Sequence, residues 1–156
     1  MRLNVITGRR PNYVQPLINR AKALNPNQPE PYKYAAVFNI NSFFQYKTAL
    51  REIERYIVLR RDDPFGHNVA GFAHYRLGQY EQSIAALERT IALDDQNGYA
   101  YALMARVYAL LARKVGVLRK KRLRAKARDM RDRAAGVRTP DPARIARLDR
   151  WLKKRL

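Results

Sequence analysis

Apolar side chains between Phe65 and Ile91 recur three and four residues apart, which is the spacing of the buried face of an amphipathic helix. The pattern breaks once, at Leu77-Gly78-Gln79-Tyr80, where glycine and polar side chains are typical of a turn. The sequence therefore predicts two helices joined by a short turn. The small residues that would let these helices approach closely are Ala70, Gly71 and Ser83, with Tyr80 and Leu87 filling the space beside them.

The same pattern occurs 34 residues earlier in the chain. When residues 64–97 are aligned with residues 30–63, similar residues coincide at six positions. These pairs are Tyr80 with Tyr46, Ser83 with Ala49, Ile84 with Leu50, Leu87 with Ile53, Ile91 with Ile57 and Leu93 with Leu59. A third copy begins at Gly98. A fixed period of this length indicates a helical repeat protein. We therefore predict repeats over 30–63, 64–97 and 98–135, preceded by an N-terminal segment, 1–29, that holds a partial repeat helix.

The third copy departs from the pattern after Arg113, and its second helix is strongly basic. That helix keeps a narrow apolar stripe, formed by Leu123, Ala127, Met130 and Ala134. A final helix should begin after Asp141, with Pro142 at its first position. This basic amphipathic segment, 136–156, is expected to cap the array, because a terminal repeat has an open apolar face. Its apolar residues are Ile145, Leu148, Trp151 and Leu152.

Gly78-x-Tyr80-x-x-Ser83, followed by Ile91-Ala92-Leu93-Asp94, resembles the second-helix signature of the tetratricopeptide repeat family. Tyr46-x-x-Ala49 with Ile57-Val58-Leu59 resembles it too, and the resemblance covers roughly residues 12–112. The departures are His67 for the favoured Trp, Ala70 for the favoured Leu, and Arg61 and Asp95 for the closing Pro. The resemblance implies an all-α fold of tetratricopeptide-type helical hairpins, stacked as a short right-handed superhelix with a basic C-terminal helical extension.

In that family's geometry the first helices line a concave groove that binds a protein segment. The positions that match its groove-facing set are mostly aromatic: Tyr34, Phe38, Asn41, Phe65, Asn68, Phe72, Tyr75, Arg76, Tyr99 and Arg106. Aromatic and Arg side chains are enriched at binding hot spots, and an Asn amide can pair with a peptide backbone. The alternative is that these aromatic residues pack against neighbouring repeats or against the last helix. The Lys and Asn clamp of the chaperone-binding members is replaced, since its positions hold Tyr34, Phe38, Tyr99 and Leu103.

Positive charge is concentrated at the C-terminal end of the chain. Residues 113–156 hold 18 of the 32 Lys and Arg residues but only 4 of the 13 acidic residues. Seven cations fall within ten residues, too many for one solvent face of a helix: Arg119, Lys120, Lys121, Arg122, Arg124, Lys126 and Arg128. We predict that this basic arm binds an anionic partner, with RNA, DNA or a ribosome as the leading candidates. The other interpretation is a helix that is merely solvated.

The leading functional hypothesis is a non-catalytic adaptor or assembly subunit of a larger complex. Its groove would hold a protein segment, and its basic arm would hold the anionic partner. The alternative is a peripheral membrane-associated subunit, whose helix over 141–156 lies on anionic lipid through Leu148, Trp151 and Leu152. A third hypothesis is a purely structural subunit whose charge maintains solubility.

The sequence gives little support to catalysis, a cofactor or a metal. No cysteine occurs, which excludes disulfides, thiolate catalysis and Cys-based zinc sites. His67 and His74 are expected to pack within a hairpin, because neither cysteine nor a third histidine accompanies them. Adjacent acidic pairs, Asp62-Asp63 and Asp94-Asp95, are expected in the turns between repeats. We therefore expect a protein that is not an enzyme.

The longest run without Lys, Arg, Asp or Glu is Tyr34–Tyr46, shorter than the about 20 residues that cross a membrane. Leu3, Val5 and Ile6 do not form the apolar core of a signal peptide, and the prolines of 11–29 fit an organellar presequence poorly. We therefore expect a soluble or peripheral protein, in the cytoplasm, with neither a signal peptide nor a transmembrane segment.

Overall fold

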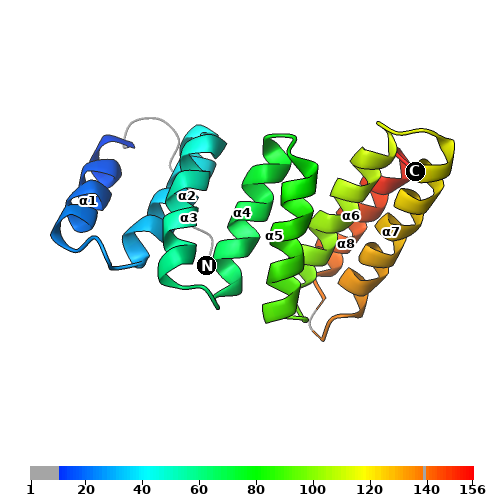
Figure 1. Ribbon diagram of the computed structural model, residues 1–156. Coiled ribbons are helices and arrows are strands. Elements are labelled where there is room, and N and C mark those ends of the chain that lie inside the picture. Colours follow the sequence, from blue (N-terminus) through cyan, green and yellow to red (C-terminus); the bar gives the residue numbers. More distant parts are fainter. Residues whose placement is uncertain (1–10, 139) are drawn as a thin grey trace.

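The computed structural model describes residues 11–138 and 140–156, and this part of the chain consists of helices joined by short connections (Figure 1). In order, the helices are α1 (Pro11–Leu24), α2 (Glu30–Phe43), α3 (Tyr46–Leu59), α4 (Pro64–Arg76), α5 (Tyr80–Leu93), α6 (Gly98–Ala112), α7 (Val117–Gly136) and α8 (Pro142–Lys153). The predicted all-α fold of stacked helical hairpins is confirmed. Helices α2, α4 and α6 begin at 34-residue intervals. Residues 1–10 of the predicted N-terminal segment lie outside the described residues.

Polar residues in the connections between hairpins fix where the next helix begins. The carboxylate of Asp63 accepts a hydrogen bond from the Phe65 backbone N–H at 2.9 Å, which caps α4. Asn97 caps α6 and Asp141 caps α8 in the same way, at 3.0 and 2.9 Å. A cap of this kind satisfies N–H groups that the first turn of a helix leaves unpaired. The N-cap that the sequence predicts at Asp141 is therefore present.

The turns of the first two hairpins each contain a residue with a left-handed backbone. Gly78 takes this role between α4 and α5, with φ of 74°. Phe44, 34 residues earlier, takes it between α2 and α3 with φ of 53°. Glycine adopts this conformation without steric cost, whereas a residue with a Cβ does not.

Small residues allow the two helices of a hairpin to pack closely. In the α4–α5 hairpin the buried Ser83 hydroxyl donates to the Gly71 carbonyl oxygen at 2.8 Å. A Cβ on Gly71 would lie 2.7 Å from Cγ of Leu87, so only glycine fits. Ala49, the equivalent of Ser83 in α3, is also fully buried. The 34-residue alignment thus places small residues where the helices cross.

The hairpins form two layers. Helix α2 contacts α4, α4 contacts α6 and α6 contacts α8, so these helices form one continuous layer. Within the described residues, α3 does not contact α5, nor α5 contact α7. The first helices are therefore closer together than the second helices, as expected on the inner side of a curved array. We call α2, α4, α6 and α8 the inner layer.

Two apolar clusters share the core. The first joins α2, α3 and α4 around the fully buried Ile53. The second joins α5, α6, α7 and α8 around the fully buried Leu87 and Leu148. Burial of one such side chain contributes about 1.5–3 kcal/mol. The two clusters together hold the array along its length.

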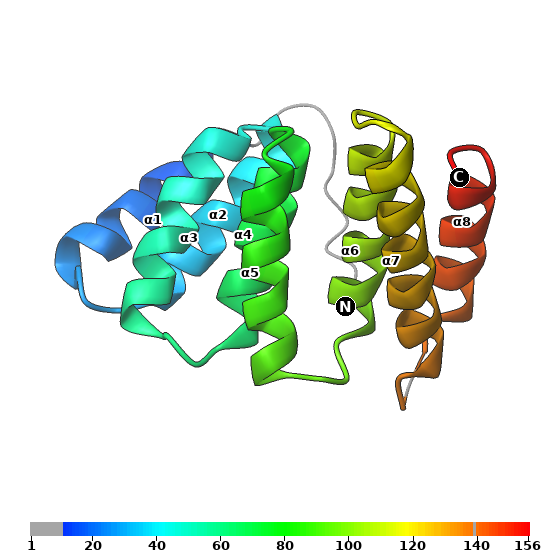
Figure 2. The same cartoon turned by 45° about the vertical axis from the view of Figure 1, so that its right-hand side comes forward.

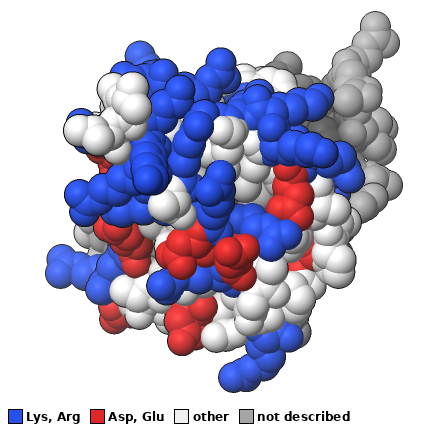
Figure 3. Space-filling view, turned by 90° about the vertical axis from the view of Figure 1, so that its right-hand side faces the viewer, with Lys and Arg blue, Asp and Glu red and all other residues white. Residues whose placement is uncertain are grey.

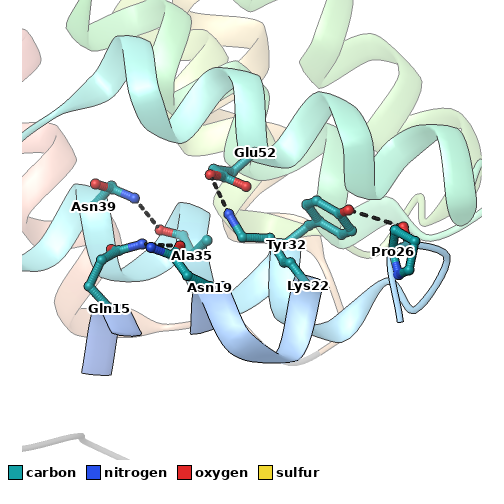
Figure 4. Close-up of polar contacts among 8 residues, drawn as sticks. All are labelled: Gln15, Asn19, Lys22, Pro26, Tyr32, Ala35, Asn39 and Glu52. Atoms are coloured by element: carbon teal, nitrogen blue, oxygen red, sulfur yellow. Dashed lines mark hydrogen bonds and ion pairs between the residues drawn. The ribbon is translucent and has the colours of Figure 1, made fainter. Parts of the chain in front are cut away.

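Helix α1 is attached to the first hairpin by polar contacts (Figure 4). Lys22 Nζ lies 2.8 Å from a carboxylate oxygen of Glu52 on α3, and both side chains are mostly buried. The Tyr32 hydroxyl donates to the Pro26 carbonyl at 3.0 Å, which fixes the connection to α2. Figure 4 shows these contacts together with the buried Asn39, whose amide donates to the Ala35 carbonyl at 2.8 Å. The partial helix before the first repeat is therefore docked on it.

Helix α8 closes the other end of the array, beside α6 and α7 (Figure 2). Leu148 and Leu152 are buried in the second cluster, and Ile145 and Trp151 pack against it. Arg131 of α7 donates two hydrogen bonds of 2.6 Å to Asp149 of α8. These bonds hold the pKa of the Asp149 carboxyl below its usual range. The apolar face of α8 is thus directed into the protein, with Ile145 and Trp151 only partly buried.

Candidate functional site

The N-terminal part of the predicted groove is the exposed part. Tyr34 is 62% exposed and Asn41 is also exposed, both on α2. Phe38 lies one turn from each and meets the ring of Phe43 edge to face, with centroids 5.3 Å apart. On α4, the Oδ1 atom of Asn68 is buried without a hydrogen-bond partner. A buried acceptor in this state is costly.

Residues in the middle of the predicted groove pack between hairpins. Phe72 meets Tyr46 of the preceding hairpin at 6.3 Å and Tyr75 of its own helix at the same distance. The Arg76 guanidinium lies over the Tyr46 ring at 4.5 Å, so its charge is positioned by an aromatic support. Phe65 meets Tyr56 at 6.2 Å. These aromatic rings therefore pack against one another within the protein, whereas the Arg76 side chain is exposed.

The C-terminal part of the predicted groove is covered by α8. The guanidinium of Arg144 lies 5.1 Å from the Tyr99 ring centre, and burial raises the pKa of the Tyr99 hydroxyl. Arg106 lies over the Trp151 ring at 5.8 Å. Tyr99 and Arg106 therefore pack against the last helix, which the sequence analysis gave as the alternative to a role in the groove. The predicted groove residues that are exposed, Tyr34, Asn41 and Arg76, lie on α2 and α4.

Inner-layer helices carry little negative charge. Within their described ranges, α4 and α6 contain no acidic residue, α2 contains Glu30 and α8 contains Asp149. Glu30 lies 3.9 Å from Arg60, and Asp149 is paired with Arg131. The cations of this layer are Lys33, Arg76, Arg106, Arg144, Arg147, Arg150 and Lys153. Its field is therefore positive.

The predicted basic arm is the N-terminal half of α7. Five of its seven cations are exposed, and Lys120 and Arg124 are half-buried. None of the seven forms an ion pair with another described residue, because Asp129, Asp132 and Asp149 are engaged with Arg131 and Arg133. Figure 3 shows Lys and Arg spread over much of this end of the molecule, with smaller acidic areas among them. The arm therefore offers unneutralised positive charge to solvent.

Sequence reasoning missed exposed apolar residues beside the arm and in the first hairpin turn. Val117 and Leu118, the first two residues of α7, are 84% and 91% exposed. Both lie N-terminal to the apolar stripe of that helix, which packs on α6. Phe44 is 66% exposed despite its left-handed backbone. Two features of the sequence indicate these exposed residues. One is the apolar pair that follows Gly116, and the other is the phenylalanine at position 44, where the next repeat has glycine.

Neither histidine belongs to a metal site in the described part of the chain, which has no group of three His, Cys, Asp or Glu residues able to hold an ion. His67 Nε2 lies 3.0 Å from the Arg61 carbonyl, and His74 Nδ1 lies 2.8 Å from Oε1 of Gln79. Each histidine thus ties a helix to a neighbouring turn. Among the described residues, no helix is both long and apolar enough to cross a bilayer.

No family model matches the sequence, and no curated protein matches it. Nineteen chains of solved structures do match. One is the crystal structure of MamA, which aligns with a TM-score of 0.72 and 17% sequence identity, over 88% of this chain and 73% of that chain. MamA has a tetratricopeptide-type helical repeat fold. The chain described here therefore has a helical repeat fold similar to that of MamA.

Proposed function

We propose that this chain is a non-catalytic scaffold that holds a protein segment on its inner layer, between α2 and α4. The observation that supports this most directly is that predicted groove residues are exposed on both of these helices, Tyr34 and Asn41 on α2 and Arg76 on α4. An aromatic anchor and a backbone-pairing amide are the two kinds of contact that an extended segment needs. The likeness of the fold to MamA agrees with a helical scaffold, and we expect no enzyme activity.

Site-specific cross-linking tests this proposal. A photoreactive residue at position 34 is expected to form adducts with a protein partner, whereas one at position 58 is not. Val58 is a matched control because it is 56% exposed and lies on a second helix. With the partner identified, Tyr34→Ala should weaken binding by about 2 kcal/mol, and Val58→Ala should leave it unchanged. Equal adducts at both positions, or unchanged affinity of Tyr34→Ala, would refute the proposed groove.

The same proposal gives the basic arm an anionic partner. Its seven unpaired cations repel one another, and an external polyanion would relieve that repulsion. RNA, DNA and a ribosome are the partners that the sequence suggests. A titration with RNA tests them, because phosphate contacts release counterions and the log-log salt slope is about 0.7–0.9 per contact. Absence of any salt-dependent binding to an anionic ligand would refute this assignment.

A further inference from the structure

The ends of the hairpins form two opposite edges of the molecule. The turns within the three hairpins, and the end of α8, lie at one edge in both views (Figures 1 and 2). The connections between hairpins lie at the other. We call the first the turn edge (residues 41–48, 75–82, 113–122 and 150–156) and the second the linker edge (residues 25–30, 58–65, 92–99, 136–138 and 140–143).

The two edges differ sharply in charge. The turn edge carries twelve Lys and Arg residues and one acidic residue, Glu81. The linker edge carries three Lys and Arg residues and six acidic ones, two of which, Asp63 and Asp141, cap the helices that start there. Negative charge is therefore concentrated where the hairpins connect, and positive charge where each hairpin turns. The turn edge is therefore the surface that an anionic partner should meet.

The turn edge also exposes apolar side chains. Leu118 and Val117, with 91% and 84% of their surface exposed, are the two most exposed of the large hydrophobic residues described. They stand between Arg113-Lys114 and Arg119-Lys120. At the first turn of the same edge Phe44 is exposed next to Phe43. Phe44 occupies a backbone position that favours glycine, so its presence there is not explained by the stability of the turn.

Cations surrounding protruding apolar side chains match the chemistry of an anionic lipid surface. Lipid headgroups attract Lys and Arg, and the boundary below them accepts aliphatic and aromatic side chains. A nucleic-acid backbone would use the cations but has no comparable place for Val117 and Leu118. Charge and apolar exposure together favour lipid. Helix α8 offers less apolar surface for this contact, because Leu148 and Leu152 are buried and Ile145 and Trp151 are partly buried.

We propose that the turn edge docks on an anionic lipid bilayer, with Val117, Leu118 and Phe44 entering its interface and the adjacent Lys and Arg residues contacting headgroups. This inference rests on the part of the proposed function that gives the basic arm an anionic partner. The turn edge includes Asn41, Tyr75 and Arg76 of the predicted groove, whereas Tyr34, the residue on which the groove is tested, lies outside it.

Co-sedimentation of the whole chain with vesicles tests the apolar contribution. Wild type is expected to bind vesicles of phosphatidylcholine with phosphatidylglycerol at about 0.15 M salt, and to bind pure phosphatidylcholine weakly. Val117→Ser combined with Leu118→Ser should weaken binding about tenfold or more. The matched control is Leu24→Ser combined with Val58→Ser, two exposed aliphatic residues away from the turn edge, which should leave binding unchanged. Circular dichroism checks that each variant folds.

The cationic contribution is tested with three charge-removing substitutions, Arg119→Gln, Lys120→Gln and Lys121→Gln. They should weaken binding by a factor on the order of one hundred, while the control set Arg20→Gln, Arg51→Gln and Arg61→Gln removes equal charge elsewhere with a smaller effect. Equal losses from both sets, or full binding by the Val117 and Leu118 double variant, would overturn the proposal. Wild type that binds RNA but not anionic vesicles would overturn the lipid inference and retain the anionic partner. Wild type that binds neither would overturn both.

Discussion

At the residue scale, the tightest constraint is the contact between Gly71 and Leu87. A Cβ at position 71 would lie 2.7 and 2.8 Å from two side-chain atoms of Leu87, within a fully buried crossing. Gly71→Ala should therefore destabilise the protein by about 1–3 kcal/mol through overpacking, although alanine favours helices. Chemical denaturation measures the loss. Gly136→Ala is the control, because no atom lies within 4 Å of its added Cβ; equal stability of the two variants would contradict the close crossing.

Phe44 leads to the opposite expectation for a glycine substitution. Its φ of 53° costs a residue with a Cβ about 1–2 kcal/mol, and its ring is largely in solvent. Phe44→Gly should therefore raise the free energy of unfolding by roughly 1 kcal/mol. The reciprocal change, Gly78→Ala, should lower it by a similar amount, since Gly78 has φ of 74°. A less stable Phe44→Gly protein would show that the phenylalanine packs more than its exposure indicates.

At the scale of the element, Asp63 joins the second helix of one hairpin to the first helix of the next. One carboxylate oxygen caps α4 through the Phe65 N–H, and the other accepts a short hydrogen bond from the buried Tyr56 hydroxyl. Asp63→Ala removes the cap and leaves that hydroxyl unpaired, which should cost about 2–3 kcal/mol in thermal or chemical unfolding. Asp62→Ala, at the exposed neighbour, should cost less than about 0.5 kcal/mol. Similar losses at both positions would contradict this role of Asp63.

The hydrogen bond between Tyr56 and Asp63 predicts that the stability of the protein depends on pH in the alkaline range. Burial, followed by the hydrogen bond to Asp63, raises the pKa of Tyr56 from 10.0 to about 12. A raised pKa means that the folded state favours the neutral phenol, so this stabilisation is complete below pH 10 and is lost as the pH rises towards 12. The stability difference between wild type and Tyr56→Phe should therefore shrink over that range. A constant difference would show that Tyr56 titrates alike in the folded and unfolded states.

At the scale of the whole molecule, the sequence predicts the repeat well because the repeat is local. The period places Ala49 and Ser83 at helix crossings, and the Asp141 signal places the start of α8. The groove is harder to predict, since Tyr99 is covered by Arg144 from a helix more than forty residues away. Helical phase assigns a residue to a face but does not identify what later packs on that face. The turn edge was missed for the same reason: it is assembled from turns that are distant in sequence.

The two core clusters lead to the last prediction, which concerns cooperativity along the array. In a repeat protein each unit contacts only its neighbours, so damage at one end should remain partly local. Ile53 and Leu148 are both fully buried, one in each cluster. Ile53→Ala and Leu148→Ala should each lower the free energy of unfolding by about 2–5 kcal/mol.

Hydrogen exchange should then show lost protection mainly in α1–α4 for the first variant and mainly in α6–α8 for the second. Helix α5 contacts α4 as well as α6 and should be affected by both. Uniform loss of protection in either variant would mean that the clusters unfold as one unit, and that the interface between α5 and α6 couples them more strongly than their separate packing suggests.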